Sequence, residues 1–275
     1  MRSARFPALL LLLLAGCTPD RPTPAAVSAE ASGAPRAGMV NTANPHATAA
    51  GVAMLERGGT AVDAAIAAHA VLGLVEPQSS GLGGGGFMLV HDAASGEREV
   101  IDGRETAPAG AFPEMFMAED GTALPHRERV QSGHAIGVPG AVALYRTAHE
   151  RHGALPWAEL FAPAIELAEA GFEVSPRLHA SLVRIAGYTD IEENPDTGAY
   201  FYPGGEALPV GHLLVNEAYA ETLSGIAERG PEAFYEGTVA EAIVARAAQA
   251  PRGSTMVAAD LAAYEARVRE PVCGA

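Results

Sequence analysis

An arginine at the predicted end of a strand is the best candidate for binding chemistry in this sequence. Arg104 lies in the segment IDGRETAP, residues 101–108, after an apolar run and before a turn, a rim position from which a side chain can reach a cleft. A guanidinium group matches a carboxylate with two parallel hydrogen bonds. In a chain with a formal net charge of -15, an anionic substrate needs such a local cation. The alternative is a salt bridge between Arg104 and a neighbouring carboxylate, which the residues alone favour.

The glycine cluster GLGGGGFMLV, residues 81–90, has the letters of a dinucleotide-binding loop without its context. Gly81, Gly83 and Gly86 fit GxGxxG, which holds a pyrophosphate when it follows a strand and opens a helix. Here an alanine-rich helical segment precedes the cluster, and an apolar strand follows it. No P-loop pattern occurs in the sequence. We therefore predict a helix-to-strand connector and no nucleotide site.

Other groups of titratable residues have structural explanations. The segment HERH carries His149 and His152 three residues apart, whereas the zinc protease motif HExxH places its histidines four apart. We predict a solvated helix end there, with histidines near the negative end of the helix dipole. Asp63 and His69 lie on different faces of one apolar helix, and we expect Asp63 to form a capping box with Thr60 and His69 to be a hydrogen-bonded core residue. No GxSxG nucleophile motif is present.

Helices and strands are mixed along the globular part without regular alternation. The predicted elements are a strand at 38–41, a helix capped by Asn44, a buried helix from Thr60, a hairpin between residues 87 and 101, a helix from near Gly140, helices at Trp157–Ala170, Ser175–Ile185, Asn216–Arg229, Thr238–Gln249 and Ala259–Tyr264, and a strand within ARVREPV. That strand is the last predicted element and has no partner after it in the sequence. The pattern predicts a layered α/β, that is α+β, arrangement.

The N-terminal segment resembles a bacterial lipoprotein signal. Arg2 and Arg5 form a basic start, residues 9–14 are leucines, and LAGC ends at Cys17. The resemblance implies cleavage before Cys17, acylation of its thiol, and an exported protein, periplasmic or at the cell surface, that is lipid-anchored to a membrane. A plain secretory signal is the alternative. Residues 18–37 are rich in Pro, Ala and Ser, and we predict a disordered tether.

Composition limits the classes of partner. The chain is 48% hydrophobic and 19% charged, so residues 38–275 suffice for one large domain. All 18 basic residues are scattered arginines in an acidic chain, which disfavours nucleic acid and anionic membrane surfaces. Of two cysteines, Cys17 is assigned to lipid, so Cys273 has no partner and no disulfide framework is expected.

Five segments together resemble the large-subunit portion of the gamma-glutamyltransferase (glutathione hydrolase) family. The likeness runs in order through nearly the whole chain after Gly38. The segments are the stretch from NPHATAAG to GGGGFMLV (residues 44–90), IDGRETAP (101–108), GVPGAVALY (137–145), FYEGTVAEAI (234–243) and DLAAYEARVREPV (260–272). The LGGGGFM and RETAP blocks at this separation are the specific part of the match.

This resemblance implies an N-terminal nucleophile hydrolase fold, here a partial αββα sandwich that is incomplete at the C-terminus. It implies a precursor that cleaves itself, so that the N-terminal threonine of a small subunit attacks the gamma-glutamyl amide of glutathione. Water or an amino acid then accepts the glutamyl group, and no metal or organic cofactor takes part. By its place in the motif, Arg104 would bind the alpha-carboxylate of the glutamyl group, which reverses the interpretation from the residues alone. The glycine loop would allow close backbone packing near the cleft.

The sequence also departs from the family pattern. It ends at Ala275, before the expected self-cleavage site, and no threonine in it, including Thr255, occupies the nucleophile motif. We therefore assign no catalytic residue and expect the fragment alone to be inactive. Val257 replaces the usual hydroxyl cap of its helix. Two alternatives remain, a glutaryl-type acylase of the same family and a non-catalytic binding lipoprotein.

Overall fold

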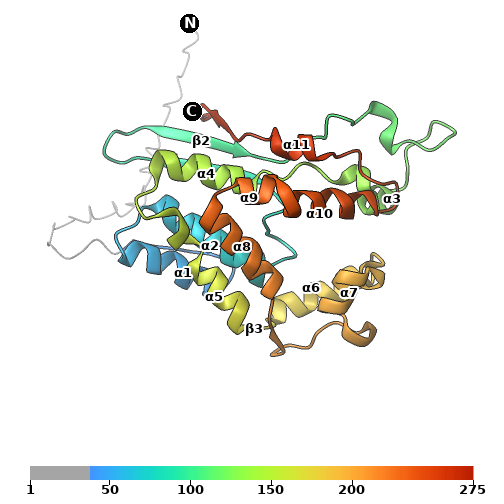
Figure 1. Ribbon diagram of the computed structural model, residues 1–275, viewed down its shortest axis with the longest axis horizontal. Coiled ribbons are helices and arrows are strands. Elements are labelled where there is room, and N and C mark those ends of the chain that lie inside the picture. The colour runs from blue at the N-terminus through green and yellow to red at the C-terminus, as the bar shows by residue number, and fades with distance from the viewer. Residues whose placement is uncertain (1–37, 275) are drawn as a thin grey trace, which may run out of the picture. The chain divides into compact units, whose positions relative to one another are not determined.

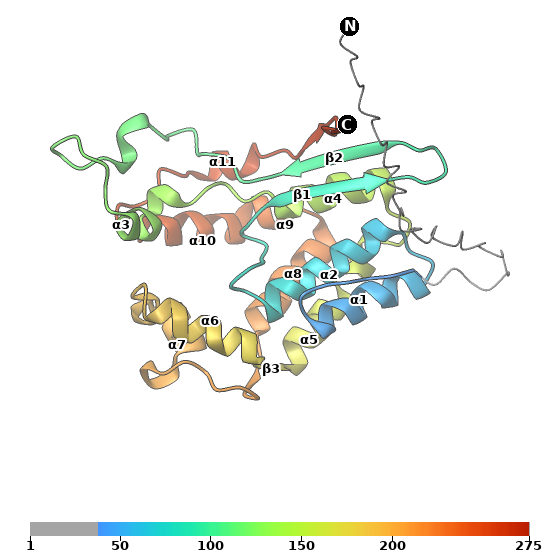
Figure 2. The ribbon, with the colours of Figure 1, turned by 180° about the vertical axis from the view of Figure 1, so that it is seen from behind.

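The computed structural model of the protein describes residues 38–274 (Figures 1 and 2). Cys17, the predicted signal at 1–17 and the predicted tether at 18–37 lie outside these residues. The strand predicted at 38–41 is wrong, because this segment has no regular structure. Val40 instead lies against the helix that follows, where a Cβ added to Gly51 would meet a Val40 methyl group at 2.8 Å. The segment packs on a helix and pairs with no strand.

The first two helices begin at the caps that the sequence predicts. Helix α1, Pro45–Glu56, starts after Asn44, whose side chain accepts a hydrogen bond from the backbone N–H of His46 at 3.0 Å. Helix α2, Ala61–Val75, has the predicted capping box: Asp63 accepts from the Thr60 backbone at 2.8 Å, and Thr60 accepts from the Asp63 backbone. Such side chains satisfy N–H groups that a helix start leaves unpaired. Helix α2 is buried, as predicted, and packs along α1.

The predicted hairpin forms two strands of a three-stranded antiparallel sheet within residues 38–274. Strands β1, Gly86–His91, and β2, Arg98–Gly103, are the hairpin, and β5, Arg267–Arg269, pairs with β2 to give the order β1-β2-β5. The last predicted strand therefore pairs with β2, a strand that comes much earlier in the sequence. Helix α4, Ala141–His152, packs on this sheet, and Figure 2 shows it alongside β1 and β2. Phe87 and Leu89 are 63% and 65% exposed, because alternate β1 residues point away from the packed face.

The remaining elements are mostly helical, as predicted. They are α3 His126–Gln131, α5 Ala162–Ala170, α6 Pro176–Ala186, α7 Pro195–Phe201, α8 Glu217–Arg229, α9 Glu232–Tyr235, α10 Gly237–Ala248 and α11 Ala258–Ala262, with short strands β3 Phe172–Glu173 and β4 Leu213–Leu214 and 3-10 turns at Pro113–Phe116, Gly133–Ala135, Trp157–Leu160, Ile191–Glu193 and Pro203–Gly205. The helix predicted from Trp157 is a 3-10 turn followed by α5. The mixture of helices and sheet confirms the layered α+β prediction.

Candidate functional site

Arg104 directly follows the end of β2. Its side chain is 63% exposed, and its Nε lies 3.2 Å from Oε2 of Glu105. The salt bridge with a neighbouring carboxylate, one of the two sequence interpretations, is therefore present. A single exposed ion pair of this type contributes at most about 1 kcal/mol. The guanidinium thus remains accessible to an anion in the solvent, so the salt bridge does not exclude a binding role.

The backbone of Arg104 is held by side chains from two other positions. Its N–H donates to Oδ1 of Asp102 at 2.9 Å, and its carbonyl oxygen accepts from the hydroxyl of Tyr264 at 2.7 Å. Asp102 also accepts from Nε of Arg269 on β5 at 2.6 Å. Partial burial raises the pKa of Asp102, but the hydrogen bonds from Arg104 and Arg269 outweigh it and leave the pKa below its ordinary value. Asp102 is therefore an ionised link between β5 and the Arg104 backbone.

Glycines let the segments around Arg104 approach each other closely. A Cβ on Gly140 would lie 2.1 Å from the Gly103 carbonyl oxygen, and one on Gly85 would lie 2.3 Å from the same atom. The N–H groups of Gly140 and Ala141, where α4 begins, donate to the Gly84 carbonyl at 2.9 and 3.0 Å. The glycine cluster thus connects α2 to β1 in the predicted order and packs against the start of α4. Because the Gly84 carbonyl accepts hydrogen bonds from these N–H groups at the start of α4, the same groups are not free to bind an anion.

Two stacked tyrosines support the same region. The rings of Tyr235 and Tyr264 are 6.0 Å apart between centroids and 6° from parallel. The Tyr235 hydroxyl donates to the Pro139 carbonyl at 3.0 Å and accepts from the Ala143 N–H at 3.1 Å. Neither tyrosine was predicted from the sequence to belong to the site, and Tyr264 was predicted to end a helix. Helix α11 ends at Ala262, so Tyr264 belongs to the connection before β5. Its occurrence in one of the five matching segments is the only sequence signal that points to it.

The other titratable residues singled out from the sequence have structural contacts. His69 is a hydrogen-bonded core residue, as predicted: Nδ1 bonds the Tyr145 hydroxyl and Nε2 lies 3.0 Å from Oγ of Ser80. Burial lowers the pKa of His69. His149 and His152 do lie in the last turn of α4, but the prediction that they are solvated is wrong.

Both of these histidines are partly buried because other segments fold onto the helix end. His149 bonds the Leu155 carbonyl at 2.8 Å, and His152 bonds Glu99 of β2 at 2.7 Å. Within residues 38–274, no group of three or more His, Cys, Asp or Glu side chains is placed to hold a metal ion. The described part of the chain also has no helix both long and apolar enough to cross a membrane. Cys273 is exposed and forms no disulfide within that part.

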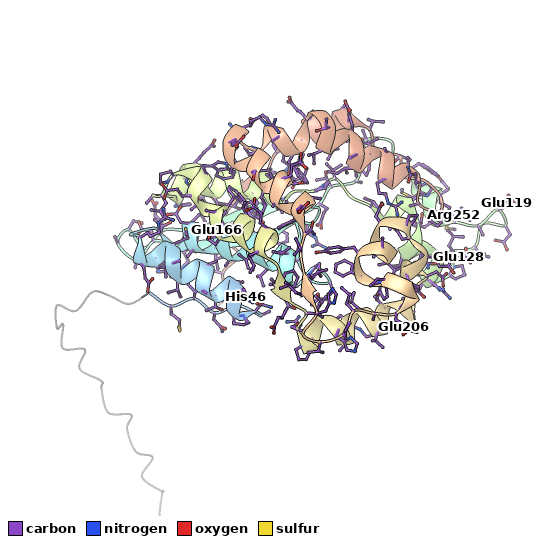
Figure 3. The ribbon with its side chains drawn as sticks, turned by 60° about the horizontal axis from the view of Figure 1, so that its bottom comes forward. His46, Glu119, Glu128, Glu166, Glu206 and Arg252 are labelled. Carbon is purple, nitrogen blue, oxygen red and sulfur yellow. The ribbon has the colours of Figure 1, made fainter. Side chains whose placement is uncertain are left out.

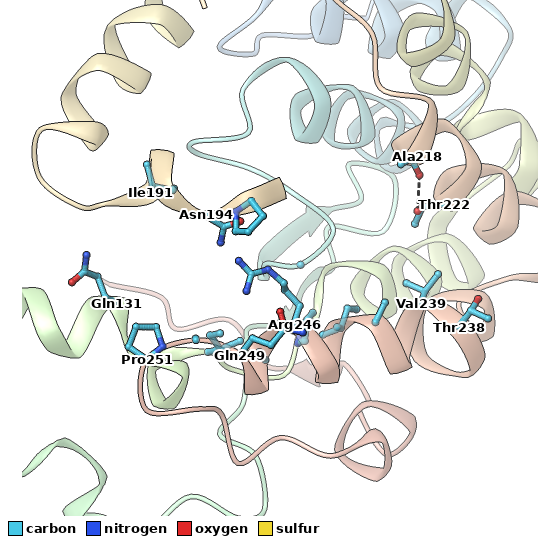
Figure 4. A pocket seen from close by; sticks show the side chains of 18 of the residues that line it. Gln131, Ile191, Asn194, Ala218, Thr222, Thr238, Val239, Arg246, Gln249 and Pro251 are labelled. Carbon is cyan, nitrogen blue, oxygen red and sulfur yellow. Dashed lines mark hydrogen bonds between the residues drawn. The ribbon is translucent and has the colours of Figure 1, made fainter. Parts of the chain in front are cut away.

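Two cavities lie near the glycine cluster and the RETAP segment. The larger, about 1380 Å³, is lined mainly by residues of α8, α10 and the segment between α6 and α7, and it reaches Gly83. Figure 3 looks into it between the α6–α7 segment and α10, and Figure 4 shows Arg246 pointing into it towards Asn194. The smaller cavity, about 330 Å³, is lined by Thr106 and Tyr264 among others. Arg104 itself lines neither, so we place the candidate site at the exposed end of β2 and not in the larger cavity.

Known proteins are similar to the part of the chain that contains this candidate site. The family model of gamma-glutamyltranspeptidase matches residues 47–275. A glutathione hydrolase proenzyme of Bacillus subtilis (strain 168) is 38% identical over 237 residues, which are 86% of this chain and 40% of that protein. The Acylase ACY 1 proenzyme of Pseudomonas sp. (strain SE83) is 40% identical over 242 residues, 86% of this chain and 42% of that protein.

A solved structure has the same fold. The gamma-glutamyltranspeptidase of Helicobacter pylori superposes with a TM-score of 0.82 at 33% identity, over 88% of this chain and 68% of that chain. The chain spans about 40% of the length of the curated relatives it matches.

Proposed function

The chain belongs to the gamma-glutamyltranspeptidase family, and we propose that it supplies the substrate-binding part of an enzyme that transfers and hydrolyses gamma-glutamyl groups. Glutathione is the proposed donor, and water or an amino acid is the acceptor. The observation that carries this proposal is the exposed guanidinium of Arg104 at the end of β2, inside a family match that covers the RETAP segment. No metal or organic cofactor has a role in the proposed reaction.

Arg104 binds the alpha-carboxylate of the glutamyl group in this proposal. Its side chain is exposed, and the ion pair that it forms with Glu105 within residues 38–274 is made through Nε. The two terminal nitrogens of the guanidinium can donate two parallel hydrogen bonds to one carboxylate group. A charge-assisted hydrogen bond of this kind contributes about 1.5 to 3 kcal/mol, which corresponds to about ten- to hundred-fold in affinity.

The nucleophile is supplied by a small subunit with an N-terminal threonine, produced by self-cleavage of a proenzyme. The sheet supports this part of the proposal. Phe87 and Leu89 expose large apolar side chains on one face of β1, and adjacent exposed apolar side chains on a sheet face favour contact with another layer. A second sheet on this face gives the αββα sandwich, with helices outside both sheets. We expect residues 1–275 alone to be inactive, because none of their threonines stands in the nucleophile motif of the family.

A glutaryl-type acylase is the second candidate. The Pseudomonas acylase proenzyme is as similar to this chain as the glutathione hydrolases are. A glutaryl group carries the same carboxylate as a gamma-glutamyl group but lacks the alpha-ammonium, so Arg104 serves either substrate. Discrimination between the two therefore depends on groups that recognise the ammonium.

Activity on paired chromogenic substrates tests the proposal. This chain, expressed as one proenzyme with its small subunit, should release nitroaniline from gamma-glutamyl-p-nitroanilide, and the 275-residue chain alone should not. Faster release from glutaryl-p-nitroanilide identifies the acylase. A self-cleaved proenzyme that releases nitroaniline from neither substrate contradicts both candidates and leaves a binding lipoprotein.

Export and lipid attachment at Cys17 complete the proposal, with residues 18–37 as the tether. Cells expressing the full chain with a labelled fatty acid should yield labelled protein in the membrane fraction. Cys17→Ser should remove the label, because no thiol then stands at the cleavage site, whereas Cys273→Ser should keep it. Label retained in Cys17→Ser contradicts this assignment.

A further inference from the structure

Tyr264 connects the last part of the chain to the Arg104 backbone. It lies between α11 and β5, and its hydroxyl donates to the Arg104 carbonyl at 2.7 Å, across a sequence separation of 160 residues. Burial raises the pKa of the Tyr264 phenol, with a further rise from the nearby charges of Asp102 and Glu105. The hydroxyl is therefore protonated near neutral pH and acts as the donor.

Both backbone polar groups of Arg104 are bound by side chains. Asp102 binds the N–H at 2.9 Å, and Tyr264 binds the carbonyl. These two bonds fix the peptide planes on either side of the Arg104 Cα. The direction in which a side chain leaves the backbone depends on those planes, so the bonds also limit where the guanidinium can reach.

The Tyr264 hydroxyl is itself held in place by its surroundings. The ring stacks on Tyr235, whose own hydroxyl is anchored to the Pro139 carbonyl at 3.0 Å. The backbone at Gly140 also lies close to this hydroxyl, because a Cβ on Gly140 would lie only 2.2 Å from the Tyr264 hydroxyl oxygen. The stacking and this close backbone restrict the movement of the hydroxyl that bonds the Arg104 carbonyl.

We infer that Tyr264 is a positioning residue for substrate binding, acting through Arg104. Its hydroxyl holds the Arg104 backbone so that the guanidinium is directed at the substrate carboxylate before the substrate arrives. Ordering a binding group in advance reduces the entropy lost on binding, and small displacements of such groups weaken binding and catalysis. The inference rests on the proposed function of Arg104.

Removal of the single hydroxyl tests this role in the complete proenzyme with its small subunit. Tyr264→Phe keeps the ring and its stacking on Tyr235. We expect KM for gamma-glutamyl-p-nitroanilide to rise about two- to ten-fold, as for the loss of one neutral hydrogen bond. The value of kcat should change less than about two-fold, because the lost contact acts on substrate binding.

Tyr202→Phe is the matched control. The Tyr202 hydroxyl also donates to a backbone carbonyl, that of Leu182, at 2.8 Å in the α6–α7 part of the chain. Thermal denaturation of both variants reports the stability lost with the hydrogen bond. Only Tyr264→Phe should raise KM, and an equal rise in Tyr202→Phe overturns the inference, because a general loss of stability then explains both.

A double-mutant cycle with Arg104→Ala separates the inference from the proposed function. Without the guanidinium, Tyr264→Phe should leave KM unchanged within about two-fold, because the hydroxyl acts through Arg104. The same rise in KM with and without Arg104, or no rise in either, overturns the positioning role while the function of Arg104 stands. If Arg104→Ala alone keeps the wild-type KM, the proposed function of Arg104 fails, and the inference fails with it.

Discussion

Replacement of Arg104 by alanine in the complete proenzyme should raise KM steeply and leave the fold intact. The side chain is 63% exposed and, among the residues that the structure describes, makes one ion pair, with Glu105. Its loss should cost at most about 1 kcal/mol of folding free energy, which is the upper range for exposed pairs. The lost contact to a substrate carboxylate, about 1.5 to 3 kcal/mol, corresponds to a KM about ten- to hundred-fold higher. Thermal denaturation and steady-state kinetics with gamma-glutamyl-p-nitroanilide measure the two effects separately.

Lysine at the same position distinguishes charge from geometry. Arg104→Lys keeps the positive charge but loses the planar fork, so its KM should lie between those of the wild type and the alanine variant. Arg57→Ala is the control, because Arg57 is also exposed and paired with one carboxylate, that of Glu159. Self-cleavage should continue in all three variants. A KM within about two-fold of wild type in Arg104→Ala, with self-cleavage and thermal stability intact, would refute the assignment.

Two further predictions concern the surroundings of Arg104. Gly140→Ala should destabilise the fold by about 1 to 3 kcal/mol, as overpacking does at other sites. The new methyl group would lie 2.1 Å from the Gly103 carbonyl oxygen. Denaturant unfolding measures the loss, and unchanged stability would contradict the close approach of the two backbones. Asp102 has a lowered pKa in the folded state, so its stabilising effect is present above the ordinary aspartate pKa of about 4 and is lost as the pH falls through the lower folded value. The Asp102→Asn variant should therefore be less stable than the wild type near pH 7, and it should lose less stability as the pH falls. Denaturant unfolding at a series of pH values measures both proteins. Parallel curves of stability against pH would contradict the link that Asp102 forms between Arg104 and Arg269.

Local signals in the sequence determined where most helices begin. Asn44 before Pro45 and the Thr60–Asp63 capping box are read within four residues, and the structure has both. The order of helix, glycine cluster and strand was also predicted, because the spacing of apolar residues within each segment is sufficient to identify it as a helix or a strand. These signals, and the RETAP segment with Arg104, were sufficient to predict the α+β class and to select one candidate binding residue.

Only the tertiary structure decided what holds that residue. Arg104 and Tyr264 are 160 residues apart, and Asp102 and Arg269 are 167 apart. The predicted strand near Val40 packs on α1 instead, and His152 binds Glu99 where a solvated helix end was expected. Caps and apolar periods depend on neighbours along the chain and can be read from it. Contacts between distant segments depend on how glycines, sheet register and helix packing bring their backbones together, and no local pattern encodes them.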